Sequence, residues 1–321
     1  MTEPEPDAAR AAIARVRDEV AKAVVGNEGA VTALLTALLV RGHVLLEGVP
    51  GTAKTLLTKA LAAALQLDEK RVQFTPDLMP SDVTGQLVYR PAEERFHFRQ
   101  GPVFTNLLLA DEINRTPPKT QAALLEAMEE RQVSVEGARR ALPEPFLVVA
   151  TQNPIEYEGT YPLPEAQLDR FLFKVLIDYP TRDHEREIVG RHDAGMDPHD
   201  LKALGLEAVA GPAELQAARS AVTRLRVDER VRDYIVDLVR GTRETPSLTL
   251  GVSPRGATML LHASKAWAWL SGRDYVTPDE VKAVAPAALR HRVQLRPEVE
   301  LEGATADGVL DGVFAGVAVP R

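Results

Sequence analysis

The 321-residue sequence contains no cysteine. This absence excludes disulfide-stapled scaffolds, thiolate-bound zinc, iron–sulfur clusters and cysteine nucleophiles. A long hydrophobic run is also missing: the longest, Ala30 to Val40, is interrupted by Thr32 and Thr36 and falls far short of the ~20 apolar residues that a membrane-spanning helix needs. There is no excess of basic residues either, since 46 acidic and 38 basic residues give a net charge of −8. This balance argues against a nonspecific nucleic-acid or anionic-membrane binder, although it is compatible with a local basic patch.

The N-terminus has neither the basic start nor the apolar core of a secretory signal, because Met1 to Asp7 is acidic and rich in proline. We therefore expect a disordered tail over residues 1–8 and a cytoplasmic location. Hydrophobic residues make up 45% of the chain and charged residues 26%, which is the balance of a folded globular protein. Because single domains run to ~50–250 residues, the length favours two domains.

Hydrophobic periodicity divides the chain into an α/β part and a helical part. Apolar residues recur at helical spacing over 8–24 and 30–40. Short, nearly continuous apolar runs follow, and they suit a parallel sheet with helices on both faces. The expected strands are 44–47, 72–75, 107–110, 146–151 and 173–176. Helical periodicity dominates from residue 182, so we expect an α/β core over 9–180 and a smaller all-helical domain over 181–321.

Three helix starts are indicated by a hydroxyl residue directly before a proline. They are Thr116-Pro117, Ser253-Pro254 and Thr277-Pro278, and in the third Glu280 completes a capping box. The sequence therefore predicts helices that begin at these three prolines.

A glycine-rich segment follows the expected strand 44–47 and precedes a helical run from Leu56 to Leu65. A loop in this position points backbone N–H groups inward beside a helix N-terminus, which suits a triphosphate. Lys54 would neutralise the β- and γ-phosphates of ATP, and Thr55 would bind Mg²⁺ through its hydroxyl. The predicted nucleotide contacts here are Gly48, Val49, Pro50, Gly51, Thr52, Ala53, Lys54, Thr55 and Leu56.

Ala53 occupies a position where this kind of loop usually has glycine. We expect helical dihedral angles at Ala53, which would suit alanine at small cost. The alternative for the whole segment is a Gly-Pro turn followed by an ordinary surface lysine.

Two carboxylates, Asp111 and Glu112, come directly after the expected strand 107–110. Ligands of parallel sheets bind at the carboxyl ends of the strands, so we expect this pair beside the phosphate-binding loop. Asp111 would hold Mg²⁺, partly through water, and Glu112 would act as the general base that polarises the attacking water. The alternative is a solvated acidic pair at a strand end.

Three further polar residues are candidates with open alternatives. Asn153 follows the strand 146–151 and could contact the γ-phosphate, or form an Asx turn before a proline. Arg170 could stabilise charge on the γ-phosphate in its own or a neighbouring subunit, or form an intrachain salt bridge. Arg255 lies one residue after the helix start at Pro254, where it could reach the nucleotide or be a surface arginine.

Together these stretches resemble an AAA+ ATPase, and specifically the MoxR family. The resemblance spans roughly residues 25–256. It is carried by LLEGVPGTAKT (45–55), QFTPDLMPSD (73–82), GPVFTNLLLADEINR (101–115), QAALLEAMEE (121–130), VATQNPIEYEGTYPLPEAQLDRF (149–171) and GVSPRG (251–256). Alanine before the loop lysine is frequent in this family as well.

The resemblance implies a P-loop core with a five-stranded parallel sheet in the order 5-1-4-3-2, and a helical C-terminal lid. It also implies a ring, usually a hexamer, with ATP and Mg²⁺ at each subunit boundary. Asn153 matches the family's first sensor, and Arg170 matches the arginine finger that acts on the neighbour's ATP. Arg255 matches the second sensor, acting in its own subunit, while Val25 and Gly26 match the adenine pocket, with Val24 a weaker candidate.

Two insertions read as hairpins, at about 85–99 and 132–145. In related proteins such insertions face the pore or a client, and Arg139 and Arg140 could meet an acidic client or be a solvated tip. The resemblance implies chaperone-like remodelling, maturation or metal loading of a protein client with a von Willebrand factor A-domain partner. The alternatives are a nucleic-acid motor, which the acidic balance disfavours, and a nucleotide-gated scaffold without hydrolysis.

Overall fold

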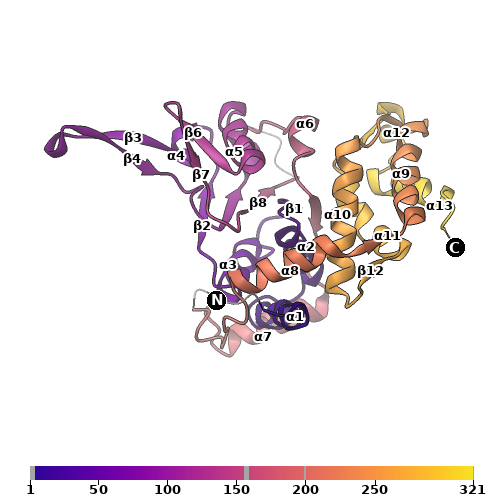
Figure 1. The fold of residues 1–321 in the computed structure, drawn as a ribbon, viewed down its shortest axis with the longest axis horizontal. Coiled ribbons are helices and arrows are strands. Elements are labelled where there is room, and N and C mark those ends of the chain that lie inside the picture. The colour runs from indigo at the N-terminus through magenta and orange to yellow at the C-terminus, as the bar shows by residue number, and fades with distance from the viewer. Residues whose placement is uncertain (1–3, 155–158, 199, 321) are drawn as a thin grey trace.

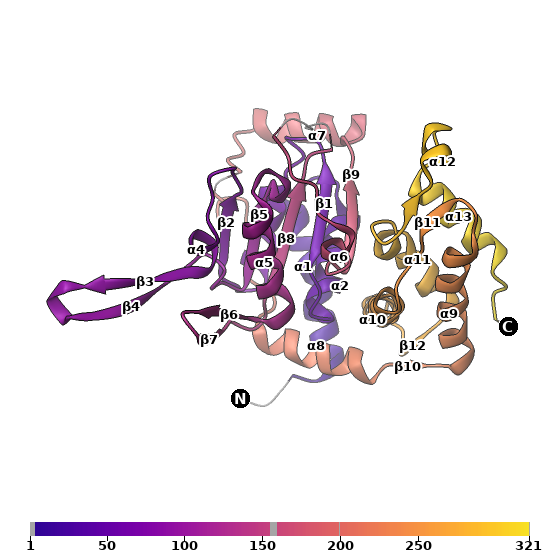
Figure 2. The ribbon, with the colours of Figure 1, turned by 90° about the horizontal axis from the view of Figure 1, so that it is seen from above.

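The computed structural model describes residues 4–154, 159–198 and 200–320. Its centre is a parallel sheet whose strands lie in the order β2-β5-β8-β1-β9 (Figure 2). Numbered along the chain within this sheet and read from β9, the order is 5-1-4-3-2, as predicted. The strands are β1 (Val44–Gly48), β2 (Glu69–Gln73), β5 (Leu107–Asp111), β8 (Leu147–Gln152) and β9 (Phe173–Ile177).

The central strands are apolar because the sheet is covered on both faces. In β5 and β8 every residue is buried except the last, and this last residue is polar in both strands. The edge strand β2 differs, since its sequence EKRVQ is mostly polar and largely exposed. The predicted strand 72–75 was therefore misplaced, because an edge strand needs no continuous apolar run. The observed strand starts three residues earlier and pairs Gln73 with Asp111.

Two groups of helices cover the two faces of the sheet. Val44 and Leu46 of β1 point into a core that the first helices of the chain and α8 build, whereas Leu45 points to the opposite face, which α5 covers. The first group is α1 (Pro6–Ala23), α2 (Glu28–Leu39), α3 (Lys54–Ala64) and α8 (Pro212–Arg224), and the second face has α5 (Pro118–Glu130). This sandwich fixes the carboxyl ends of β1, β5 and β8 side by side. The prediction of a disordered tail over residues 1–8 was wrong for residues 6–8, because α1 already begins at Pro6.

Both predicted insertions are antiparallel hairpins. The first, β3 (Gly85–Arg90) with β4 (Arg95–Gln100), follows the short helix α4 (Pro80–Thr84) and projects away from the body of the molecule (Figures 1 and 2). The second, β6 (Gln132–Val135) with β7 (Ala138–Ala141), lies beside its base. The guanidinium of Arg140 stacks over the ring of Phe98 at 3.9 Å, so the two hairpins are joined side by side.

The chain after β9 is mainly helical, as predicted, and its last helices form a bundle beside the sheet (Figure 2). Two short ladders that the periodicity did not reveal, β10 with β12 and β11 with β13, connect the bundle's loops. The elements are α7 (Arg182–Asp193), α9 (Glu229–Glu244), α10 (Pro254–Leu270), α11 (Pro278–Leu289), α12 (Pro297–Leu301), α13 (Ala306–Gly316), β10 (Arg226–Val227), β11 (Leu248–Leu250), β12 (Tyr275–Val276) and β13 (Gln294–Leu295). Helix α8 lies after residue 180 in the sequence, but it packs on α1 of the core and not in the bundle. The domain boundary at residue 180 therefore stays a prediction.

Two of the three predicted helix starts are confirmed. Ser253 caps α10 by accepting a hydrogen bond from the Gly256 amide, and Thr277 caps α11 in a capping box with Glu280. The start at Thr116 is wrong, because Pro117 itself is the N-cap of α5 and the helix begins at Pro118. The Thr116 side chain is buried instead of facing the first turn.

Within the described part of the chain, no helix combines the length and the apolar character that crossing a bilayer requires.

Candidate nucleotide-binding site

The glycine-rich loop between β1 and α3 borders a cavity of about 570 Å³ at the carboxyl end of the sheet. Asp111, Glu112 and Asn153 line the same cavity, so the structure brings three separate sequence predictions together. Val49 does not line the cavity, although its carbonyl oxygen bonds to the loop lysine. The loop residues that do are Gly48, Pro50, Gly51, Thr52, Ala53, Lys54, Thr55 and Leu56.

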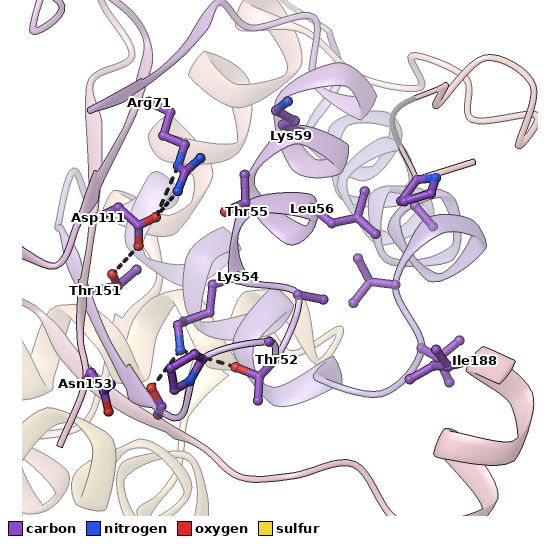
Figure 3. A pocket seen from close by; sticks show the side chains of 18 of the residues that line it. Thr52, Lys54, Thr55, Leu56, Lys59, Arg71, Asp111, Thr151, Asn153 and Ile188 are labelled. Atoms are coloured by element: carbon purple, nitrogen blue, oxygen red, sulfur yellow. Dashed lines mark hydrogen bonds and ion pairs between the residues drawn. The ribbon is translucent and has the colours of Figure 1, made fainter. Parts of the chain in front are cut away.

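The ammonium of Lys54 is enclosed by its own loop (Figure 3). Its Nζ donates to the carbonyl oxygens of Gly48 and Val49, each at 2.8 Å, and lies 3.3 Å from the Thr52 hydroxyl. Burial lowers the pKa of Lys54 from its usual range, and the negative charges of Asp111 and Glu112 act in the opposite direction. A cation held at the centre of a ring of backbone groups is suited to receive a phosphate.

Ala53 does not have the helical dihedral angles that the sequence led us to expect. It has φ 59° and ψ 21°, which is left-handed backbone, and it is the N-cap of α3. A residue with a Cβ pays about 1–2 kcal/mol for this conformation, so the prediction of a small cost was wrong. The loop has to reverse direction before the helix starts, and this is why glycine is usual at the position.

Asp111 and Glu112 are held by residues of the neighbouring strands. The guanidinium of Arg71 contacts Asp111 Oδ2 through Nη2 at 2.6 Å and Nε at 3.1 Å, and the hydroxyl of Thr151 donates to Asp111 Oδ1 at 2.6 Å (Figure 3). The Glu112 carboxylate accepts a hydrogen bond of 2.7 Å from Gln73 Nε2. Both acids therefore have fixed positions at the edge of the cavity.

Glu112 also has left-handed backbone, with φ 56°. Its amide donates to the Thr151 hydroxyl at 2.9 Å, and its carboxylate lies 3.1 Å from Arg115 Nε. Such strained backbone persists only where surrounding contacts determine it, and it is concentrated at functional sites. Glu112 lines the cavity in this conformation.

Sequence reasoning missed Arg71, Gln73 and Thr151, which all line the cavity. The position of Arg71 and Gln73 on the neighbouring strand could have indicated their role. Gln73 pairs with Asp111 across the sheet, and Arg71 lies two residues before Gln73 on the same face of β2. Polar residues are common at the carboxyl end of an edge strand. They indicate a binding site only when the strand order is known and places that strand beside the acidic one.

The cavity extends past the loop to a pocket between α1 and α7. Val24 and Val25 line it as predicted, together with Ile188 and Met196, which sequence reasoning missed. Gly26 does not line the cavity. It has φ 73°, and a Cβ on it would lie 3.0 Å from a ring nitrogen of His184, so it forms the turn that leads to α2.

Arg170 and Arg255 lie elsewhere, on a second cavity of about 270 Å³ that does not include the phosphate-binding loop. Glu129, near the end of α5, joins them: its Oε2 is 3.1 Å from Arg170 Nε, and its Oε1 is 3.2 Å from Arg255 Nη2. The predicted contact of Arg255 with the nucleotide of its own subunit stays a prediction, because Arg255 lies apart from the phosphate-binding loop in this structure. The reason is that α10 packs against the segment after α6 (Glu165–Leu168) and not over the loop.

Asp169 fixes that packing. Its carboxylate accepts from Arg292 Nε at 2.7 Å and from the Ser253 hydroxyl at 3.1 Å. The Arg292 side chain is almost fully buried, and burial lowers its pKa to about 10. The segment that carries Arg170 and the helix start that carries Arg255 therefore form one unit. Residues 155–158, in the family-like stretch 149–171, lie outside the described residues.

Comparison with known proteins agrees with this site. The sequence profile of the ATPase family associated with various cellular activities (AAA) matches residues 43–173, and that of the AAA lid domain matches residues 240–312. A crystal structure from Cytophaga hutchinsonii ATCC 33406 aligns with a TM-score of 0.89 at 39% identity, covering 98% of this chain and 96% of that one. The sheet, the loop, the acidic strand end and the helical lid define an AAA ATPase.

Three similar proteins identify the family of AAA ATPases to which the chain belongs. The chain is 47% identical over 303 residues to the uncharacterized protein YeaC of Bacillus subtilis, covering 94% of this chain and 93% of that protein. It is 43% identical over 312 residues to the chaperone MoxR1 of Mycobacterium tuberculosis, covering 94% and 81%. It is 34% identical over 337 residues to the protein MoxR of Methylorubrum extorquens, covering 97% and 96%. The chain belongs to the MoxR family of AAA ATPases.

Proposed function

We propose that this protein hydrolyses ATP with Mg²⁺ and uses the reaction to remodel a protein client. The observation that carries the proposal is the shared cavity, in which Lys54 of the phosphate-binding loop faces the carboxylates of Asp111 and Glu112. A cationic loop beside two fixed acids is what phosphoryl transfer to water requires.

The residues present fit Mg²⁺. Asp111 already neutralises a cation, the guanidinium of Arg71 at 2.6 Å, and carboxylate and hydroxyl oxygens are the donors that Mg²⁺ prefers. Asp111 and the hydroxyl of Thr55 would hold the ion. When bound, Mg²⁺ offsets the negative charge of the β- and γ-phosphates. Arg71 would have to leave Asp111 as the ion arrives.

Each protein group has a separate task in the proposed reaction. The amides of the loop and Lys54 bind the triphosphate, while Val24, Val25 and Ile188 provide an apolar surface for the base. Glu112 accepts a proton from the attacking water, and Gln73 holds its carboxylate at 2.7 Å. Asn153, at the end of β8, would orient the water or the γ-phosphate.

The positions of Arg170 and Arg255 support assembly into a ring. Both arginines lie on a cavity apart from their own loop, so they would serve the ATP of a neighbouring subunit. An arginine supplied from a neighbour stabilises the charge that develops during transfer. A homo-oligomer, with a hexamer as the family's usual size, therefore completes each active site.

The name of one relative supports the part of the proposal that concerns a protein client. One similar protein is named chaperone MoxR1, which supports a remodelling role. A von Willebrand factor A-domain partner, and maturation or metal loading of the client, extend the proposal. The projecting hairpin β3–β4, with Tyr89 and Phe96 exposed, provides a surface for contact with such proteins.

Glu112→Gln tests the reaction. The variant should bind ATP as the wild type does, while its rate of ATP hydrolysis falls by a factor of at least about 100, because an amide cannot accept the proton. Lys54→Ala should lose ATP binding itself. The matched control is Glu126→Gln, on the exposed face of α5, which should hydrolyse ATP normally. Normal turnover by Glu112→Gln would contradict the proposed role of Glu112.

Capture with the Glu112→Gln protein tests the partner. The variant, loaded with ATP and Mg²⁺, serves as bait in lysate from the native source, in parallel samples with and without nuclease. Recovery of a von Willebrand factor A-domain protein would support the proposed partner. Recovery of replication or repair proteins only, and their loss on nuclease treatment, would favour a nucleic-acid motor instead.

A further inference from the structure

We propose that Glu129 is the internal counter-ion of a two-arginine unit, and that the ATP of the neighbouring subunit displaces it. This inference rests on the proposed function and deepens it, because it assigns a positioning residue to the part of the site that would act across the subunit boundary. It starts from one contact: a single carboxylate gives one oxygen to Arg170 and the other to Arg255.

The contact joins three elements that are distant in sequence. Glu129 lies in the last turn of α5, Arg170 follows α6, and Arg255 is in the first turn of α10. Since Asp169 already ties the last two elements together, Arg170 and Arg255 keep their relative positions without Glu129. The carboxylate therefore neutralises the pair and connects it to α5, while Asp169 and Arg292 maintain its geometry.

The cavity around this pair is strongly cationic. Four arginines line it, and Glu129 is the one carboxylate among the described lining residues. Arg41, at its edge, is 3.5 Å from Glu144, and burial together with the charge of Arg41 lowers the pKa of Arg131. Such a site favours an anion with more charge than one carboxylate, and the triphosphate of ATP presents oxygens that arginine binds in pairs.

Displacing Glu129 from the two arginines costs little free energy, because these ion pairs are exposed to solvent. About a third of each of the three side chains is accessible, at 37% for Glu129, 30% for Arg170 and 39% for Arg255. Solvent weakens ion pairs of this exposure, so each contributes little to stability. Glu129 thus competes with the neighbour's ATP without preventing its binding.

The experiment measures ATP binding in a background that cannot hydrolyse it. Fluorescent ATP with Mg²⁺ is titrated into Glu112→Gln protein, with and without Glu129→Gln, at a concentration where the protein is assembled. We expect Glu129→Gln to lower the half-saturating ATP concentration about threefold to tenfold, since two exposed ion pairs no longer compete. Glu130→Gln, the exposed neighbour on α5, is the matched control and should leave the value unchanged.

A double-mutant cycle separates this role from a merely structural one. With Arg170→Ala and Arg255→Ala present as well, Glu129→Gln should change the half-saturating concentration by less than about twofold, because its effect acts through the two arginines. The same shift with and without the two arginines, or no shift at all in a protein that binds ATP and melts normally, would overturn the inference. Failure of the Glu112→Gln protein to bind ATP would overturn the proposed function and the inference with it.

Discussion

Histidine 43 shows how one buried side chain makes stability depend on pH. Its ring accepts a hydrogen bond from the Val148 amide at Nδ1, at 3.0 Å, and its Nε2 lies 3.1 Å from the Met128 carbonyl oxygen. Burial lowers the pKa of His43 to about 4. The neutral ring therefore joins β8 to α5, and protonation would remove the acceptor on which the Val148 amide depends.

We expect the free energy of unfolding to fall as the pH falls from about 6.5 to 4. The unfolded chain binds a proton at His43 below its ordinary pKa of 6.5, whereas the folded chain does so only near 4. The loss reaches about 3 kcal/mol at pH 4 and is absent above about pH 7. Burial also lowers the pKa of His291, which adds a loss of the same sign.

Denaturant titrations at pH 7, 5.5 and 4.5 check this dependence. His43→Gln should be less stable at pH 7, since it loses hydrogen bonds, but its stability should depend less on pH than that of the wild type. His184→Gln, on the half-buried side of α7, is the control and should keep the full slope. An unchanged slope in His43→Gln would rule out this residue as the cause.

At the residue scale the sequence predicted the chemistry of the cavity but not its backbone. Lys54, Asp111 and Glu112 could be assigned because their positions after strands imply the carboxyl edge of the sheet. The left-handed conformations of Ala53 and Glu112 could not, because neither residue type favours φ > 0. Tertiary contacts impose both conformations, and sequence patterns do not record such contacts.

Among the elements, the tie between the lid and the core is the least expected. The family resemblance assigned Arg255, on the first turn of a lid helix, to the nucleotide of its own subunit, whereas α10 packs against the segment after α6. The determinant is instead the pair Asp169 and Arg292, which are 123 residues apart. No local pattern predicts a salt bridge at that separation. The edge strand β2 was misplaced for a related reason, because its polar sequence depends on its place in the sheet.

Asp169→Asn should weaken this tie. The substitution leaves the buried Arg292 guanidinium without its counter-charge, which costs about 3–5 kcal/mol. We expect a melting temperature lower by roughly 5–8 °C, since an unfolding entropy of about 2.1 cal/mol/K per residue makes each kcal/mol worth about 1.5 °C in a chain of 321 residues. ATP binding at the loop should persist while hydrolysis falls. Thermal melting and ATP titration measure the two effects, and Glu165→Gln on α6 serves as the control.

If instead Asp169→Asn melts like the wild type and hydrolyses ATP normally, then the lid is held by other contacts. The candidates are the packing of α10 on α2 and the hydrogen bond from His291 to the Phe171 carbonyl oxygen. That outcome would separate the position of Arg255 from the Asp169 carboxylate.

For the whole molecule, the separation of the two cavities fits the proposed ring, in which a lone subunit would lack a complete active site. Lys54 and Glu112 line one cavity, whereas Arg170 and Arg255 line another. The proposed ring brings the second cavity of one subunit to the first cavity of the next. Activity should therefore depend on subunit concentration as well as on ATP.

Mixing two inactive variants tests this dependence. Arg170→Ala keeps an intact loop and acids but cannot serve its neighbour, whereas Glu112→Gln cannot catalyse but can supply its arginine. An equal mixture should recover about a quarter of the wild-type rate, because about a quarter of random boundaries combine the two intact halves. Each variant alone is the control. No recovery after subunit exchange has been verified would indicate that Arg170 acts within its own chain.

The short junction between α5 and the second hairpin has a mechanical consequence. Only Arg131 separates the end of α5 from the start of β6, and Arg140 joins that hairpin to the projecting one through Phe98. A tilt of α5 at Glu129 would therefore move both hairpins, because the connection between α5 and β6 is one residue long. With six residues in each of its strands, or roughly 20 Å of length, the projecting hairpin turns a small tilt into a larger stroke at Tyr89 and Phe96. In the proposed remodelling reaction, the projecting hairpin would therefore act as a lever arm whose exposed aromatic residues contact the client.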